Sequence, residues 1–248
     1  MHSFSQTHKI NPVVFKNLTK KLLYKLYHNA VDLNHKNIRL LLEKDAKTVF
    51  LDLGCDDGIL TKELAAHIGT KKMYGIDIVA KRLKHAKRLG IVTVKADLNK
   101  KLPFKDRSFG AIHANQVIEH VTNVDVFIAE IKRLLRPGGY AIISTENGSS
   151  WCNIFASVMG WQIFSLTNVT SKALGIGNPL AYYRNEPLEL PSWLHKTIFN
   201  IRGLRELFEV YGFQVEETKG AGYFPLPSSL GTLDVTHSHF ITIKARKK

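Results

Sequence analysis

Apolar residues follow two different spacings along this chain. Between residues 13 and 44 they recur every three or four positions, as at Leu18, Leu22 and Leu26, which predicts amphipathic helices. From residue 48 onward, short apolar runs rich in β-branched residues alternate with stretches of helical periodicity. This alternation predicts an α/β fold, in which helices cover both faces of a mostly parallel sheet.

The pattern predicts seven strands and four helices after the N-terminal helical region. Strands are expected at 48–53, 72–77, 91–97, 108–115, 140–147, 214–219 and 239–248. Helices are expected at 57–68, 80–89, 124–135 and 203–213. Pro137 and the two glycines that follow it are expected to separate the third of these helices from its strand.

One stretch interrupts the alternation. Residues 148–200 contain scattered glycine and proline and hold all three tryptophans of the chain, which favours an inserted segment. We therefore expect an N-terminal helical cap over 1–46, a main domain formed by 47–147 and 201–248, and an inserted lid over 148–200.

Composition narrows the classes of protein that fit. The two cysteines are too few for a disulfide framework or a four-thiolate zinc site. No apolar run is long enough to cross a bilayer, and the first residues lack the apolar core of a leader, so we expect a cytoplasmic protein without a membrane span. The formal net charge of +14 suits an anionic partner, although the basic residues are spread along the chain, as on a solvated surface.

The first predicted strand ends in a glycine-rich turn, "DLGCDDG". Gly54 and Gly58 permit backbone conformations and close ligand approach that a side chain would block. The next two strands end in Asp77 and Asp97, and ligands of open parallel sheets bind beyond the carboxyl ends of the strands. Since a carboxylate can accept both hydroxyls of a ribose, these strand ends predict a nucleoside site.

In the same order, these segments resemble motifs of the class I S-adenosylmethionine (SAM)-dependent methyltransferases. "FLDLGCDDG" is similar to the loop below the methionine part of the cofactor, and "FGAIHANQVIEHV" and "LLRPGGYAIIST" to the fourth-strand and fifth-strand motifs. The resemblance implies a Rossmann-like seven-stranded fold, SAM as cofactor and S-adenosylhomocysteine as product. It assigns the ribose to Asp77 and the adenine to Asp97 and Leu98, and the full cofactor set to Asp52, Gly54, Cys55, Asp56, Gly58, Asp77, Ile78, Asp97, Leu98 and Asn115.

Asp56 departs from this resemblance, because the family usually has glycine there. Its carboxylate either accepts a hydrogen bond from the cofactor's ammonium or crowds the loop.

A dinucleotide-binding dehydrogenase is the competing interpretation of this glycine-rich turn, and it fits the sequence less well than a methyltransferase does. Its G-x-G-x-x-G fingerprint requires glycine where this chain has Asp56 and Ile59.

The residues after the fourth predicted strand are candidates for catalysis. A sulfonium already activates its methyl group, so the protein mainly has to align the acceptor for direct in-line displacement and to exclude water. His120, with Glu119 beside it, is the candidate general base, and a capping or packing histidine is the alternative. Related methyltransferases with an E-x-x-E-H motif bind a metal here. In this chain Gln116 replaces the first glutamate, so Glu119 and His120 are the two good ligands that remain and we expect no metal. His195 of the inserted segment is a possible further ligand, but nothing in the sequence places it there.

The acceptor is expected to contact the inserted segment, with Trp151, Tyr182, Tyr183 and His195 as candidate contacts. An aromatic lid favours a small-molecule, glycan or lipid-linked acceptor, with peripheral membrane contact as one way to reach it. Two alternatives remain: an RNA methyltransferase that uses the basic surface, and a SAM-binding protein that has lost catalysis.

Overall fold

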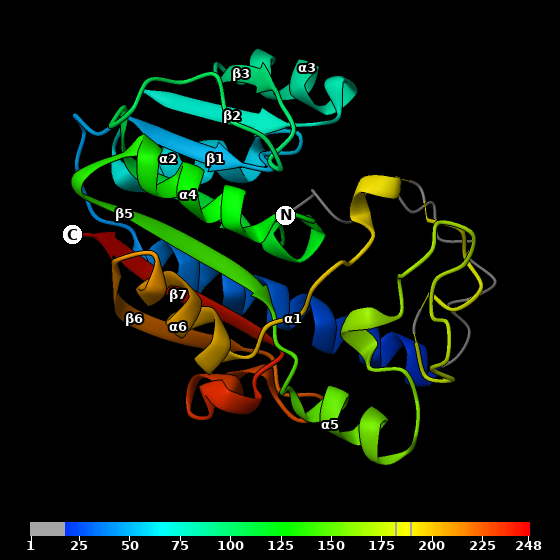
Figure 1. Ribbon diagram of the computed structural model, residues 1–248. Helices are drawn as coiled ribbons and strands as arrows, with labels where there is room; N and C mark the ends of the chain where they lie inside the picture. Colours follow the sequence, from blue (N-terminus) through cyan, green and yellow to red (C-terminus); the bar gives the residue numbers. More distant parts are fainter. Residues whose placement is uncertain (1–17, 182, 189) are drawn as a thin grey trace.

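The structure is a computed structural model that describes residues 18–248 except 182 and 189. Its centre is a seven-stranded sheet with the order β3-β2-β1-β4-β5-β7-β6 (Figure 1). The strands are β1 Phe50–Leu53, β2 Met73–Asp77, β3 Val92–Lys95, β4 Phe109–Asn115, β5 Leu135–Glu146, β6 Phe213–Ala221 and β7 Phe240–Lys247. The α-helices are α1 Leu18–Leu41, α2 Ile59–Ile68, α3 Ala80–Arg88, α4 Val124–Leu134, α5 Trp151–Val158 and α6 Ile201–Val210.

Strands β1 to β5 pair in parallel, and only β7 pairs antiparallel with both of its neighbours. This arrangement confirms the predicted mostly parallel, seven-stranded α/β sheet. One local prediction was wrong: β5 begins at Leu135, so the proline and glycines at 137–139 lie within the strand as assigned. The pairing with β4 shifts register there, between Phe109 and Ala111, which accommodates the turn-forming residues.

Two buried apolar clusters lie on opposite faces of the sheet. On one face, Phe127 and Ile131 of α4 and Phe208 of α6 pack against strand residues. On the other, Ile38 and Leu41 of α1 pack with residues of α2 and the strands. Helices therefore cover both faces, as the alternating pattern predicts.

Helix α1 is held to the sheet by buried polar groups as well as by apolar packing. The Asn34 Nδ2 group donates to Asn115 Oδ1 at 3.0 Å and to Ser144 Oγ at 2.9 Å, and Asn34 Oδ1 accepts from Thr242 Oγ1 at 2.9 Å. Asn34 thus contacts β4, β5 and β7 at once. Because these groups have little access to water, the network fixes where α1 crosses the sheet.

The segment 148–200 contains α5 and two short 3-10 helices, Phe164–Leu166 and Pro191–Trp193, joined by irregular chain. Asn153 of α5 holds part of it together, because its Nδ2 donates to Asn147 O and to Ser165 Oγ, both at 2.9 Å. The segment returns along β5, where the Gly148 amide donates to Phe199 O at 2.8 Å. Its last part thereby approaches the carboxyl edge of the sheet.

We predict that Asn34→Ala lowers the free energy of unfolding by about 2 kcal/mol, because it leaves buried hydroxyl and amide groups without partners. Urea denaturation followed by circular dichroism measures the change. Asn29→Ala is the matched control, since Asn29 is exposed on the same helix, and its effect should stay within about 0.5 kcal/mol. Equal effects of the two substitutions would show that the buried network adds no stability.

Candidate functional site

A cavity of about 670 Å³ lies at the carboxyl ends of the parallel strands. Residues of α1, the turn after β1, the ends of β2 to β4 and the segment 191–196 line it. Nine of the ten predicted cofactor residues are among them: Asp52, Gly54, Cys55, Asp56, Asp77, Ile78, Asp97, Leu98 and Asn115. The structure therefore brings the three acidic strand ends of the sequence prediction into one crevice.

Gly54 and Gly58 have different roles. Gly54 lines the cavity at φ 72°, and a Cβ there would lie 2.5 Å from Cγ2 of Val117. Gly58 is not among the lining residues. Its φ is 83°, and an added Cβ would lie 2.5 Å from Ile91 Cδ1 and 2.7 Å from Ala86 Cβ. The prediction that Gly58 contacts the cofactor is thus not supported by its position: its small size lets α2 start close to α3.

The carboxylates at the ends of β2 and β3 are partly satisfied by the backbone. Asp77 Oδ1 accepts from the Val79 amide at 2.8 Å and Oδ2 from the Asp56 amide at 3.1 Å, while burial raises the pKa of this carboxyl. Asp97 accepts from the backbone and side chain of Asn99, and these hydrogen bonds lower its pKa. Each carboxylate keeps free lone pairs for hydroxyl or amine donors.

Asp56 has a partner that the sequence analysis did not foresee. Its carboxylate forms an ion pair with the Arg82 guanidinium of α3, and its backbone has a φ of 50°. Burial raises the pKa of Asp56, and Arg82 opposes that rise. The aspartate is therefore accommodated by an ion pair beside the cavity.

Helix α1 supplies site residues that the sequence analysis missed. His28, Asp32, His35 and Arg39 all line the cavity. Their separations of four, three and four residues place them on one helical face, which is the signal that could have found them. Burial lowers the pKa of His35 to about 4, so this imidazole is neutral near pH 7. Arg39 brings a cation to the cavity.

A buried acid–histidine pair connects β1 with β4 below the cavity. His113 Nδ1 lies 2.7 Å from Asp52 Oδ1, and Thr61 of α2 donates to the other carboxylate oxygen. His113 Nε2 is buried without a hydrogen-bond partner. Both carboxylate oxygens of Asp52 thus have protein partners. Asp52 lines the cavity, but its carboxylate is less available to a ligand than those of Asp77 and Asp97.

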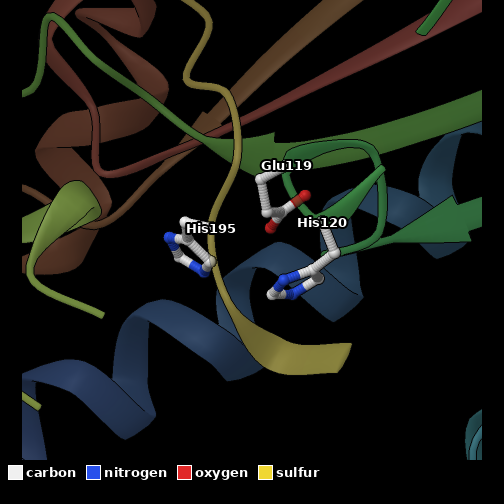
Figure 2. Close-up of side chains that lie close together, drawn as sticks. All are labelled: Glu119, His120 and His195. Carbon is white, nitrogen blue, oxygen red and sulfur yellow. The ribbon is translucent and has the colours of Figure 1, made fainter. Parts of the chain in front are cut away.

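Glu119, His120 and His195 form the second part of the site (Figure 2). One ligand atom from each lies within 4.8 Å of those of the others. Glu119 and His120 come from the 3-10 helix Ile118–His120 after β4, and His195 comes from the inserted segment. Backbone contacts join the two elements, because the Lys196 amide donates to Glu119 O at 2.7 Å.

Hydrogen bonds fix the orientation of each of these side chains. His120 Nδ1 lies 3.2 Å from Leu194 O, and His195 Nδ1 lies 2.6 Å from Ser165 O. Each contact assigns the Nδ1 proton and leaves the Nε2 lone pair available. Glu119 Oε2 accepts from Thr145 Oγ1 at 2.9 Å, whereas Oε1 is buried without a partner.

Burial tunes the protonation of this cluster. It raises the pKa of the fully buried Glu119 to about 7, against the opposing effect of His195. It lowers the pKa of His120 to about 4, with a further contribution from His195. His120 is therefore neutral near pH 7, as a general base or a metal ligand must be.

The expectation of no metal rested on Glu119 and His120 alone, because the sequence does not place His195 beside them. His195 adds a third ligand, from 75 positions further along the chain than His120. Gln116, in place of the missing glutamate, lines the cavity, and its buried Nε2 has no hydrogen-bond partner. Two imidazoles, and a carboxylate oxygen without a hydrogen-bond donor, suit a borderline cation such as Zn²⁺ better than Mg²⁺.

Of the predicted acceptor contacts that the structure describes, none is among the residues that line the cavity, and His195 lies beside it in the cluster with Glu119 and His120. Trp151 is stacked on His237 with ring centroids 4.5 Å apart, and its Nε1 donates to Tyr223 Oη at 2.7 Å. Tyr183 is half-buried outside the lining residues, and Tyr182 lies outside the described residues. Trp193 lines the cavity instead. The aromatic content of the insertion did not reveal which ring faces the site.

The helices were compared with the length and the apolar character that a membrane span requires. Within the described part of the chain, no helix combines the length and the apolar character needed to cross a bilayer.

Comparison with known proteins identifies the family. A family described as methyltransferase domain matches residues 26–218. The ubiquinone biosynthesis O-methyltransferase of Dictyostelium discoideum is 25% identical to this chain, in an alignment that covers 88% of it. That of Pelagibacter ubique is 28% identical over 62% of this chain. The chain spans 64% and 61% of their lengths. A solved SAM-dependent methyltransferase from Thermotoga maritima shares the fold, with a TM-score of 0.61, 19% identity, and 95% and 99% of the two chains covered.

These findings confirm the prediction of a SAM-dependent methyltransferase domain with a class I fold and exclude the dehydrogenase reading. The match covers well over half of the residues. The chain therefore belongs to the methyltransferase domain family.

Proposed function

We propose that the chain methylates a hydroxyl oxygen of a small, largely apolar molecule. The observation that carries this proposal is the cluster of Glu119, His120 and His195 beside the cofactor cavity. A hydroxyl needs help to lose its proton, and this cluster offers either a neutral base or a set of ligands for a cation. The similarity to proteins named ubiquinone biosynthesis O-methyltransferase supports the same choice of acceptor atom.

The cofactor is proposed to lie across the carboxyl ends of β1 to β4. Asp77 would accept the ribose hydroxyls, and Asp97 and Leu98 would flank the adenine. Arg39 of α1 is the cation proposed for the methionine carboxylate, because charge-assisted hydrogen bonds are the strong ones in such sites. The turn at Gly54 lets the backbone approach the methionine part closely.

The transfer is a single displacement. A lone pair of the acceptor oxygen forms a bond to the methyl carbon while the carbon–sulfur bond breaks, and its electron pair stays on sulfur to give S-adenosylhomocysteine. The acceptor proton passes to His120 Nε2, whose other nitrogen is held by Leu194 O. Alignment and exclusion of water provide most of the rate, since the sulfonium already activates the carbon.

Glu119, His120 and His195 are alternatively the residues proposed to hold a divalent cation, in which case His120 Nε2 is a ligand and not the base, because one lone pair cannot take both a proton and a cation. When bound, such a cation polarises an oxygen ligand and lowers the pKa of its proton. Each histidine has its Nδ1 fixed by a backbone carbonyl, and such outer contacts orient metal-ligating imidazoles. The partnerless Glu119 Oε1 is the third ligand.

The acceptor is proposed to enter between α1 and the segment 191–196, so that residues 148–200 act as its lid. Tyr27, Val31 and Phe240 give this part of the cavity an apolar wall, which suits an aromatic ring or a lipid-linked acceptor better than a glycan. The division into a cap, a main domain and a lid is part of the same proposal.

We predict that Asp77→Ala weakens SAM binding by about 10-fold to 100-fold, because the lost contacts are charge-assisted hydrogen bonds worth about 1.5–3 kcal/mol. Isothermal titration calorimetry with SAM measures the change. Asp125→Ala is the control, since Asp125 lies on α4 and bonds only to the exposed Tyr211 hydroxyl among the contacts described. Unchanged affinity in a folded Asp77→Ala variant would exclude the ribose assignment.

We predict that His120→Ala and His195→Ala each lower kcat by at least about 100-fold while SAM affinity stays within about twofold. The reason is that both rings serve the acceptor rather than the cofactor. Elemental analysis and calorimetry with Zn²⁺ or Mn²⁺ alone should show one bound cation in the parent protein and none in either variant. His67→Ala, at the end of α2, is the control. Full turnover by both variants contradicts the proposed site.

An acceptor screen tests the class of substrate. We expect release of S-adenosylhomocysteine with phenols or catechols, and faster release when these carry an apolar chain. RNA transcripts and oligosaccharides form the comparison set. Turnover on RNA alone would favour the basic-surface alternative, and SAM binding without turnover on any acceptor would favour a non-catalytic binding protein.

A further inference from the structure

Asp56 and Arg82 form a charged pair at the wall of the cofactor cavity. Their side chains are 25% and 15% exposed, so water screens the pair only partly. The Asp56 carboxylate contacts Arg82, while its backbone amide donates to Asp77 Oδ2 at 3.1 Å. The residue that departs from the family's glycine thus connects the predicted ribose acid with a cation on α3.

Arg82 also contacts the inserted segment. Its guanidinium carbon lies 4.7 Å from the centroid of the Trp193 ring, in a cation–π contact. Asp56, Arg82 and Trp193 line the same cavity, together with Asp97 at its adenine end. The insertion therefore reaches the part of the cavity predicted for the nucleoside.

The same short segment reaches the acceptor cluster. Leu194 follows Trp193 and accepts the hydrogen bond from His120 Nδ1. His195 follows in turn, and the Lys196 amide donates to Glu119 O. Because only one residue separates Trp193 from His195, a shift of the tryptophan relative to Arg82 also shifts the histidine.

We propose that Asp56 and Arg82 are positioning residues that hold Trp193 over the nucleoside pocket and thereby keep His195 in the acceptor cluster. Asp56 acts through Arg82 and makes no contact of its own with the cofactor's ammonium. Cofactor release then requires the Arg82–Trp193 contact to open. This inference rests on the cofactor placement of the proposed function but not on the identity of the acceptor, so its test needs no acceptor.

The experiment measures dissociation of isotope-labelled SAM during a chase with excess unlabelled SAM, in the full chain and without acceptor. We expect Arg82→Met and Trp193→Leu each to speed dissociation about tenfold, as the loss of a partly buried cation–π contact allows. The double variant should be no faster than the faster single variant, because both substitutions remove one contact. Arg88→Met, on the same helix, is the matched control and should leave the rate unchanged.

A second double-mutant cycle distinguishes two roles for Asp56: action through Arg82, or direct contact with the cofactor. Asp56→Asn should speed dissociation in the parent protein and have no further effect in the Arg82→Met background. Equal effects in both backgrounds would mean that Asp56 contacts the cofactor directly, which overturns the proposal. Parent-like dissociation from Arg82→Met would overturn it as well.

Arg82→Lys provides a second test that can still be carried out if the Arg82→Met variant does not fold. Lysine keeps the charge for Asp56 but lacks the planar group that stacks on an indole. Dissociation should therefore lie between the parent and Trp193→Leu rates, and a rate equal to the parent's would exclude the stacking contact as the restraint.

Discussion

The site depends on one constraint: parallel strands bring their carboxyl ends to the same edge of the sheet. β1, β2, β3 and β4 pair in parallel, so the residues that end them must meet although they are far apart in sequence. Asp77, Asp97 and Asn115 face one cavity for this reason. The two faces of the sheet are covered by apolar clusters, and the polar side chains of the site converge at this edge.

The edge alone forms an open crevice, and two segments outside the β/α alternation close it. α1 contributes a polar face and is held by Asn34, whose bonds reach three strands. The insertion contributes Trp193 and His195 through a stretch held mainly by backbone contacts to the residues after β4. The first support is a buried network and the second is local, so the insertion is the part of the wall that can move with less loss of packing.

The features that could be predicted from the sequence are those that depend on local periodicity of apolar residues. Strand ends, the glycine turn and the covering helices follow from local patterns, so Asp77 and Asp97 were found from their place after apolar runs. His195 was a candidate, but its place beside Glu119 and His120 could not be predicted in this way, because it lies in irregular chain whose path is set by contacts such as that of Lys196 with Glu119. Gly58 lies outside the cavity lining, and its close helix packing is a second use of glycine that the sequence does not distinguish from close ligand approach. Trp151 also lies outside the lining, because composition does not determine which ring faces a cavity.

Asp56 departs from the family's glycine, and a neighbouring cation compensates for the cost of this substitution. A non-glycine residue at φ 50° is disfavoured, and a partly buried carboxylate adds a cost of desolvation. The Arg82 guanidinium offsets that cost, and the same group then has a face available for the Trp193 ring. A single residue in the cofactor loop thus becomes connected to a lid that also carries His195. In such an arrangement, a change in the insertion that suits a new acceptor also alters how tightly the cofactor is enclosed, because both depend on the same few residues.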